Sequence, residues 1–390
     1  MIIRGVKYKE KEQILSSALI RARPLTQRDS FTGSAPAPFV GRFGYPNINV
    51  GILSPVQHDD SAWLYDAPRH WAQTNTGIRE VVDFRTRMVN SRFTSNVKQP
   101  DKMVEIAQDV AMSVKPVDID VSLEKKPSLN ISTDQWIAPM GPQARLKQLS
   151  LASNPNIPTK VQKYFDDTDA LASEAVIDLY KHSVDENALS RMLSVGVFGK
   201  QKKLVPTRWS ITATDDILAN NFLEKVRDQE IGEYQSYFGS YLGNYYLVLF
   251  FPERWSYELF EMYVKPGVLE FSTDFEEFEG RKNYAETCAG GYYTVRMALA
   301  EHMMKNKRQN SALVLRFITD EYVLPLGVWV TRSAARKALE SKPISFSSKE
   351  LMLTYARHLA RKKFGVDINP ILEKSKIMKE KQKIIANFTC

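Results

Sequence analysis

The chain has 390 residues, of which 43% are hydrophobic and 11% aromatic, enough to build a sizeable core and to exclude wholesale disorder. Its two cysteines, Cys288 and Cys390, exclude a disulfide scaffold and a structural zinc site built on Cys. The net charge is +8, and residues 331–390 hold 14 Lys+Arg against five Asp+Glu, so the positive charge belongs to the last sixth of the chain. Such a block either binds phosphate backbones or forms a solvated, lysine-rich surface.

Two features argue against a membrane or secreted protein. The longest strongly apolar run, residues 245–251, is far shorter than the ~20 residues that a spanning helix needs. The first twelve residues are charged and lack the apolar stretch of a signal peptide. We therefore expect a cytoplasmic protein without a membrane partner.

The order of the predicted elements indicates an α+β fold with an irregular Gly/Pro-rich N-terminal segment, an antiparallel strand cluster in the middle third and a helical C-terminal region. Residues 24–60 combine many turn formers with aromatic side chains, which predicts an ordered but irregular segment. Helical spacing then predicts helices over 78–88, 102–114, 168–182, 185–195, 291–305, 332–340, 348–363 and 370–383. A strand is expected at 117–121, a long connection at 127–160, and strands at 234–251, 255–264 and 268–271.

Familiar catalytic motifs do not occur in the sequence. It has no phosphate-binding loop, no dinucleotide fingerprint, no His-Glu-x-x-His and no nucleophile elbow, so we assign no catalytic residue, metal or cofactor, and leave open whether it is an enzyme. The adjacent pair Asp215 and Asp216 has two interpretations. It forms an acidic, Mg²⁺-binding site with Arg208, as in a nuclease, or it begins a helix that Thr214 caps.

The last nine residues carry the strongest functional signal. Gln382, Ile385 and Phe388 are spaced by three, so in a 3₁₀ turn they form one edge that a partner groove can accept. This is the spacing of the peptide box that docks on the sliding clamp of replication. Among fifteen Gln residues only Gln382 is followed by an aliphatic residue at +3 and an aromatic residue at +6. Thr389 stands where such boxes usually have a second large apolar residue, and the alternative is a helix end that folds back on its own domain.

Several segments resemble the archaeal Nre family of DNA repair proteins. They are Phe-Val-Gly-Arg-Phe-Gly-Tyr-Pro at 39–46, Leu-Val-Pro-Thr-Arg-Trp-Ser-Ile-Thr-Ala-Thr-Asp at 204–215, Ala-Gly-Gly-Tyr-Tyr at 289–293 and Pro-Leu-Gly-Val-Trp-Val at 325–330. The resemblance implies DNA damage repair with binding of the clamp, PCNA, through the C-terminal box. It also implies an Nre N-terminal domain at 24–279, an Nre C-terminal domain at 280–377 and a clamp-binding tail at 378–390. Residues 1–23 form an extension without the Cys-rich zinc finger that family members often carry.

Two arginines within these segments have open roles. Arg42 and Arg208 contact DNA phosphate, stack on bases, or bond carbonyls and carboxylates in the interior. We expect Trp209 and Trp329 to lie in the core. The leading hypothesis is a DNA repair factor that PCNA recruits and that binds DNA. The alternatives are a metal-dependent, nuclease-like DNA-processing enzyme and a clamp-bound adaptor without DNA contact.

Overall fold

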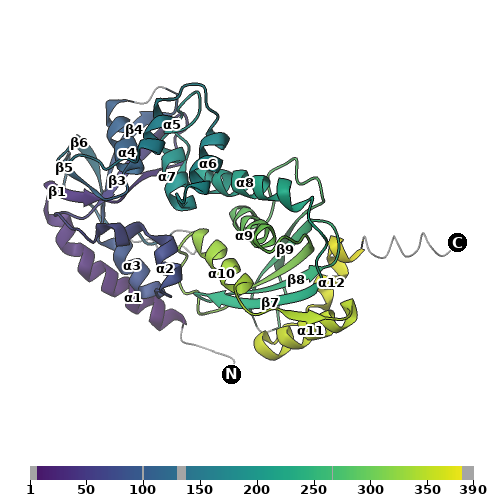
Figure 1. Ribbon diagram of the computed structural model, residues 1–390. Coiled ribbons are helices and arrows are strands. Elements are labelled where there is room, and N and C mark those ends of the chain that lie inside the picture. The colour runs from purple at the N-terminus through teal and green to yellow at the C-terminus, as the bar shows by residue number, and fades with distance from the viewer. Residues whose placement is uncertain (1–6, 99–100, 130–137, 266, 380–390) are drawn as a thin grey trace. The chain divides into compact units, whose positions relative to one another are not determined.

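The computed structural model describes residues 7–98, 101–129, 138–265 and 267–379 (Figure 1). The chain forms two compact units. The N-terminal unit comprises Tyr8–Leu218 with Leu324–Leu326, and the C-terminal unit comprises Ala219–Val323 and Gly327–Cys390 with Met1–Lys7. The division lies inside one helix, α8 (Thr207–Val226), whereas the sequence domains are expected to meet at Gly280. The α+β class is confirmed.

The N-terminal unit is built on a six-stranded mixed sheet. Its strands are β1 (Ser30–Ala35), β2 (Ala37–Val40), β3 (Asn47–Ser54), β4 (Val89–Asn96), β5 (Val117–Leu123) and β6 (Gln143–Leu151). Its helices are α1 (Lys7–Ala22), α2 (Pro68–Gln73), α3 (Ile78–Thr86), α4 (Lys102–Met112), α5 (Thr159–Asp166), α6 (Ala172–Lys181) and α7 (Glu186–Ser194), with 3₁₀ turns at Arg23–Gln27 and Ala62–Asp66. The strand order is β1-β5-β6-β4-β3-β2, antiparallel except for the parallel pair β4 and β6.

The segment 24–60 is more regular than its turn formers indicate, because it holds three strands. The turn formers separate these strands at Pro36 and at residues 41–46. Two glycines lie inside strands because neighbouring atoms leave no room for a side chain. A Cβ on Gly33 would lie 1.9 Å from the Pro55 carbonyl oxygen, and one on Gly51 would lie 2.0 Å from Asn90 Oδ1.

The prediction of a long connection at 127–160 was wrong over the stretch that forms β6. This strand pairs with β5 on one side and with β4 on the other, so backbone hydrogen bonds hold it in the sheet. Leu146 is its one buried residue, so it lacks the alternation by which strands are found in a sequence.

The C-terminal unit is a second six-stranded sheet with helices on both faces. Its strands are β7 (Tyr234–Tyr241), β8 (Asn244–Phe251), β9 (Ser256–Tyr263), β10 (Phe271–Glu276), β11 (Ser311–Ile318) and β12 (Ile344–Phe346), in the order β10-β9-β11-β8-β7-β12. Its helices are α9 (Gly290–Asn306), α10 (Trp329–Leu339), α11 (Lys349–Phe364) and α12 (Asn369–Lys374). The expected antiparallel cluster is present, and one pair within it, β9 with β11, is parallel.

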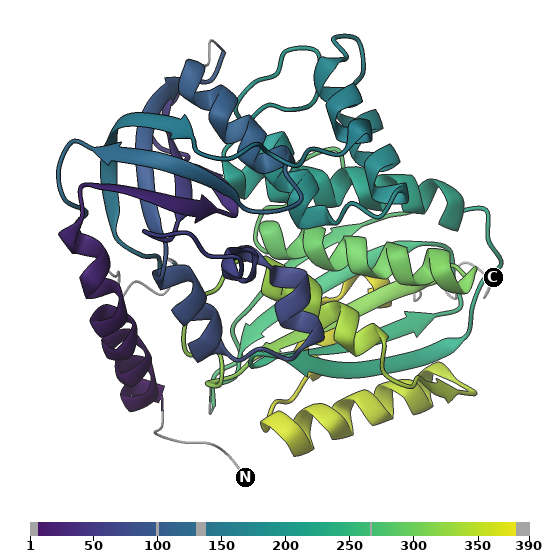
Figure 2. The same cartoon turned by 60° about the vertical axis from the view of Figure 1, so that its left-hand side comes forward.

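Helices α9 and α10 lie across one face of this sheet, and Figure 2 shows them side by side. The other face packs Leu249, Phe260 and Leu315 against α11 and α12 in one hydrophobic core. Because both faces are covered, every residue of β11 is buried. The helix expected over 370–383 ends at Lys374, and after a break at Ser375 residues 376–379 are helical again.

Membrane crossing has no support in the described part of the chain, where no helix combines the necessary length with an apolar sequence.

Candidate nucleic-acid interface

Three segments of the N-terminal unit that are distant in sequence meet through backbone hydrogen bonds. The Val40 amide donates to Thr207 Oγ1 at 2.8 Å, which joins the end of β2 to the start of α8. The Val97 amide donates to the Pro46 carbonyl at 2.9 Å, and the Leu204 amide donates to the Val97 carbonyl at 3.2 Å. The β2–β3 turn, the end of β4 and the approach to α8 therefore lie next to one another.

These segments carry exposed cations. They are Arg42, Lys98, Lys200, Lys203 and Arg208. Residues 39–49 and 196–209 contain no Asp or Glu, so the cations are not neutralised within their own segments. Lys202 differs from them because its Nζ donates to the Phe165 carbonyl and lies 4.4 Å from the centre of that ring. A cluster of uncompensated cations attracts phosphates.

Exposed aromatic rings occur on the same segments as these cations. Phe43 is 74% exposed, Tyr45 63% and Trp209 49%. The guanidinium of Arg42 lies 4.7 Å from the centre of the Phe43 ring, close enough for a cation–π contact. Together, Arg42, Phe43, Tyr45, Lys98, Lys200, Lys203, Arg208 and Trp209 form what we call the basic–aromatic surface.

The turn that carries Phe43 and Tyr45 is braced by its own backbone. The Gly41 amide donates to the Asn49 carbonyl at 2.7 Å, and the Asn47 amide donates to the Gly44 carbonyl at 2.9 Å. Gly44 has φ +89°, a conformation that favours glycine because it has no Cβ. The two rings are therefore held outward by a turn whose backbone is already ordered.

The start of α8 explains why two sequence predictions failed. We expected Trp209 in the core and a helix beginning at Asp215 with Thr214 as its cap. The helix begins at Thr207, after Pro206, so Trp209 lies in its first turn on the exposed side. Thr214 is an interior helical residue and does not cap the helix. Trp329, in contrast, is only 5% exposed, as predicted.

The acidic pair and Arg208 differ in their exposure. Asp215 is fully buried and Asp216 is half-buried, whereas Arg208 is exposed. In the part of the chain that the structure describes, no three His, Cys, Asp or Glu side chains are placed to hold a metal ion together. Arg208 lies in the first turn of α8 and its side chain is exposed. The Arg208 side chain is thus accessible to a ligand, whereas the Asp215 side chain lies in the interior.

The lysine- and arginine-rich C-terminal region divides into structural and exposed cations. Arg332 is only 3% exposed, and Arg336 Nε donates to Glu301 Oε2 at 2.8 Å. Arg357, Arg361 and Lys362 remain exposed along α11. Some of these cations therefore stabilise the fold, whereas those named on α11 face solvent.

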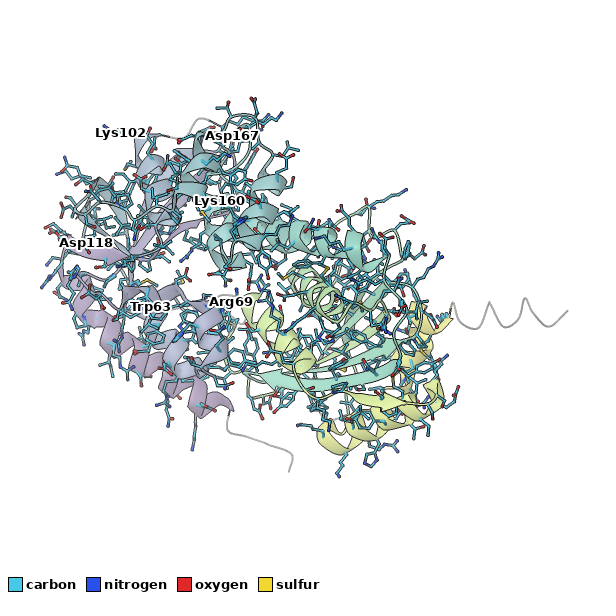
Figure 3. The ribbon with its side chains drawn as sticks, in the orientation of Figure 1. Trp63, Arg69, Lys102, Asp118, Lys160 and Asp167 are labelled. Atoms are coloured by element: carbon cyan, nitrogen blue, oxygen red, sulfur yellow. The ribbon has the colours of Figure 1, made fainter. Side chains whose placement is uncertain are left out.

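A Ser, His and Asp cluster elsewhere in the N-terminal unit resembles a hydrolytic triad in composition but differs in geometry. Asp118 on β5, labelled in Figure 3, accepts a hydrogen bond from Ser34 Oγ at 2.6 Å. His58 Nδ1 lies 3.0 Å from both carboxylate oxygens of Asp118, and this hydrogen bond raises the pKa of His58. Ser34 Oγ also lies 3.4 Å from His58 Nδ1, but the serine donates to the nearer carboxylate oxygen and the same imidazole nitrogen bonds Asp118, so the histidine is not placed to activate the serine.

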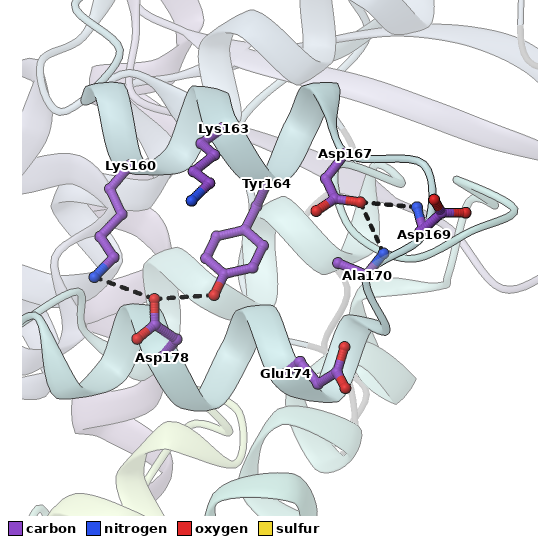
Figure 4. A pocket seen from close by; sticks show the side chains of 8 residues that line it. All are labelled: Lys160, Lys163, Tyr164, Asp167, Asp169, Ala170, Glu174 and Asp178. Carbon is purple, nitrogen blue, oxygen red and sulfur yellow. Dashed lines mark hydrogen bonds and ion pairs between the residues drawn. The ribbon is translucent and has the colours of Figure 1, made fainter.

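One open pocket of about 480 Å³ lies between α5 and α6 (Figure 4). Two of its polar groups already engage Asp178, whose Oδ2 is 3.2 Å from Lys160 Nζ and 2.9 Å from the Tyr164 hydroxyl. Asp167 accepts from the backbone amides of Asp169 and Ala170. Since these groups satisfy one another and the lining mixes both signs of charge, we assign it no ligand.

The residues that the sequence predicts to bind the clamp, Gln382, Ile385 and Phe388, lie outside the described residues. The chain just before them is anchored by Glu258 on β9, which is only 2% exposed. Its carboxylate accepts from Ser375 Oγ at 2.5 Å and from the backbone amides of Lys376 and Ile377 at 3.0 and 3.2 Å. The chain is thus fixed five residues before Gln382.

Family models cover nearly the whole chain. The model described as "Archaeal Nre, N-terminal" matches residues 11–269, and the one described as "Archaeal Nre, C-terminal" matches residues 276–388. The chain belongs to the archaeal Nre family. Curated relatives of this Nre protein include "DNA repair protein NreB" of Archaeoglobus fulgidus, 34% identical over 370 residues that make up 92% of each chain. "DNA repair protein NreA" of Haloferax volcanii is 35% identical over 340 residues, 83% of this chain and 81% of the relative. No solved structure matches.

Sequence reasoning selected Arg42 and Arg208 but not their neighbours on the basic–aromatic surface. Phe43, Tyr45 and the three lysines of this surface were missed. A usable signal was present, since the stretch 196–209 has four cations beyond Gly199 and no acid. The sum over the first 330 residues is −1, so it does not show this local excess of cations.

Proposed function

We propose that this Nre protein is a DNA repair factor that the sliding clamp, PCNA, recruits to DNA. The curated relatives that cover most of its length are named DNA repair proteins, which supports the repair role. The observation that carries recruitment is the spacing Gln382, Ile385 and Phe388, which occurs once in the sequence. We place the protein in the cytoplasm, with the chromosome and the clamp.

The anchored chain before the box supports this proposal. Where contact with DNA holds the protein beside the clamp, a tail that starts at a fixed point meets its groove at a high effective concentration. Glu258 provides that point at residues 375–377. The Ile and Phe side chains would fill an apolar groove on the clamp, and the Gln amide would hydrogen-bond beside it.

Direct DNA contact is the second part of the proposal. The basic–aromatic surface of the N-terminal unit and the exposed cations of α11 each provide positive charge that is not neutralised locally. Either one would make binding depend on salt, because phosphate contacts release counterions. The clamp-bound adaptor without DNA contact predicts a salt slope near zero instead.

Calorimetry with the purified clamp tests recruitment. The double variant Ile385→Ala, Phe388→Ala should weaken binding by at least about thirtyfold, since both anchor side chains are lost. Thr389→Ala is the matched control, because it changes the same tail at a position without a large side chain, and it should bind like the parent. Equal affinity of the double variant and the parent would refute recruitment through this box.

The nuclease-like alternative has less support from the geometry. Asp215 is fully buried, so a substrate would reach only Asp216 and Arg208 of the three residues without a rearrangement of α8. Incubation with Mg²⁺ or Mn²⁺ and with flap, duplex and single-stranded substrates still tests it directly. Cleavage that Asp216→Asn abolishes would favour the enzyme over the binding role that we propose.

A further inference from the structure

We propose that the basic–aromatic surface is a binding site for single-stranded DNA, in which unpaired bases stack on Phe43, Tyr45 and Trp209 while the surrounding cations contact phosphates. This inference rests on the proposed role in DNA repair and names the form of DNA that the N-terminal unit takes.

The three exposed rings lie on two neighbouring segments. Single exposed apolar side chains are common on protein surfaces, but three large rings on two hydrogen-bonded segments are not scattered residues. Phe43 and Tyr45 project from one turn, and Trp209 follows directly on Arg208 in the first turn of α8. The hydrogen bond from the Val40 amide to Thr207 Oγ1 holds this turn and the start of α8 next to each other.

The charge around the rings favours a nucleic acid over a protein. Apolar protein interfaces have few charged residues at their centre, whereas five exposed cations lie on the same hydrogen-bonded segments as these three rings. No Asp or Glu occurs in residues 39–49 or 196–209. Asp167 interacts electrostatically with Lys202, but that lysine is bonded to Phe165 and is not part of the surface.

Stacking requires an unpaired strand. In a duplex the faces of the bases are covered by their neighbours, so side chains reach only base edges in the grooves. In a single strand every base offers a free face, and stacking on an aromatic ring tolerates any sequence. Arg42, which lies over the Phe43 ring, extends the same platform with a planar cation.

The backbone also favours binding. The turn that carries Phe43 and Tyr45 is closed by two backbone hydrogen bonds, and the Val97 amide holds Pro46 at its end. Little conformational freedom of the protein is therefore lost when bases stack, which increases affinity.

Fluorescence anisotropy with the full chain tests the proposal. The probes are a labelled oligothymidine, a duplex of equal length and the corresponding oligouridine. We expect the single-stranded DNA to bind more tightly than the duplex, with a log–log salt slope of roughly −3 if four to five phosphates are contacted. Preference for the duplex would overturn the proposal, and tighter binding of the RNA would overturn the assignment of DNA as the ligand.

Variants separate stacking from charge. Phe43→Ala and Tyr45→Ala should each weaken single-strand binding by about fivefold or more, with a smaller effect on the salt slope. Arg208→Gln should lower the slope by about 0.7. Tyr263→Ala is the matched control, because its ring is 48% exposed in the C-terminal unit, and it should bind like the parent.

Two further measurements, thermal unfolding and clamp binding of the ring variants, separate a DNA-binding surface from a protein-docking surface. All three rings are exposed, so thermal unfolding of the ring variants should match that of the parent. Arg208→Gln tests the surface independently if any ring variant unfolds early. Unchanged single-strand binding by the Phe43→Ala, Tyr45→Ala double variant would overturn the proposal, as would a loss of clamp binding in that variant, which would mark a protein-docking surface. Failure of the tail variants to affect clamp binding would refute recruitment alone and leave this site intact.

Discussion

Replacing Glu258 by Gln tests the anchor that precedes the tail for which we propose clamp binding. The Glu258 carboxylate is buried on β9 and accepts three hydrogen bonds from Ser375, Lys376 and Ile377. One oxygen accepts from the Lys376 amide, and the other accepts from Ser375 Oγ and the Ile377 amide. A carboxylate can accept at both oxygens, but an amide group places an NH₂ donor at one of them.

The loss of stability depends on how many of these three donors lose their hydrogen-bond partner. Either orientation of the Gln amide brings its NH₂ group against at least one donor of residues 375–377, which removes one or two charge-assisted bonds. Each such bond contributes about 1.5–3 kcal/mol. Burial, which raises the pKa of Glu258, opposes the charged form and offsets part of this contribution. We therefore expect Glu258→Gln to lower the free energy of unfolding of the C-terminal unit by about 2 kcal/mol.

Amide hydrogen exchange is the most direct assay, combined with urea unfolding. Protection at the Lys376 and Ile377 amides should fall in Glu258→Gln, because these amides donate to the altered group. Glu373→Gln is the matched control, since Glu373 is exposed on α12, and its exchange should equal that of the parent. If Glu258→Gln keeps parental protection at Ile377, the carboxylate does not anchor this segment and the reasoning is wrong.

Three further predictions concern pH, packing and the tail. Burial lowers the pKa of His302 to about 4, so the unfolded chain binds a proton near pH 6.5 that the folded protein does not. The free energy of unfolding, measured in urea, should therefore fall by about 2 kcal/mol between pH 7 and pH 5, and His302→Gln should remove this pH dependence. A Cβ on Gly239 would lie 2.6 Å from the Cα of Ala338, so Gly239→Ala should lower the free energy of unfolding by about 1–3 kcal/mol in the same assay. Gly77→Ala is the control and should be near neutral, because no atom lies within 4 Å of a Cβ at that position. Thr389→Phe adds the second large residue of a complete box and should tighten clamp binding by about fivefold in calorimetry; unchanged affinity would argue against insertion of this tail.

Helices with strong local signals could be predicted from the sequence. Residues 102–114 and 348–363 combine apolar spacing with a capping residue, and the structure has α4 and α11 at these places. Asp101 accepts from the Met103 amide, and Ser348 accepts from the Leu351 amide, as N-caps do. In these helices local chemistry and tertiary packing favour the same boundaries, which is why a single sequence was sufficient.

Elements that depend on distant partners could not be predicted in the same way. The strand β6 has a single buried residue, so its pairing with β4 and β5 leaves no trace in the pattern of apolar residues. The start of α8 was misplaced for a different reason. The acidic pair at 215–216 resembles a helix N-terminus, and the competing signal of Pro206 before Thr207 was overlooked. The candidate interface depends on that start, because it determines the exposure of Trp209.

The charge of the chain shows why sums along the sequence can misdirect a search for binding sites. The last 60 residues hold a net +9, yet Arg332 is buried and Arg336 is paired with Glu301, so part of that charge is used within the fold. The first 330 residues sum to −1, yet the stretches 39–49 and 196–209 within them contain cations and no Asp or Glu. A phosphate responds to the charges within about a Debye length, roughly 10 Å at 0.1 M salt, and not to the total of a segment. A surface in a nearly neutral region can therefore bind DNA, provided that the fold gathers cations such as Arg42 and Arg208 and keeps carboxylates away.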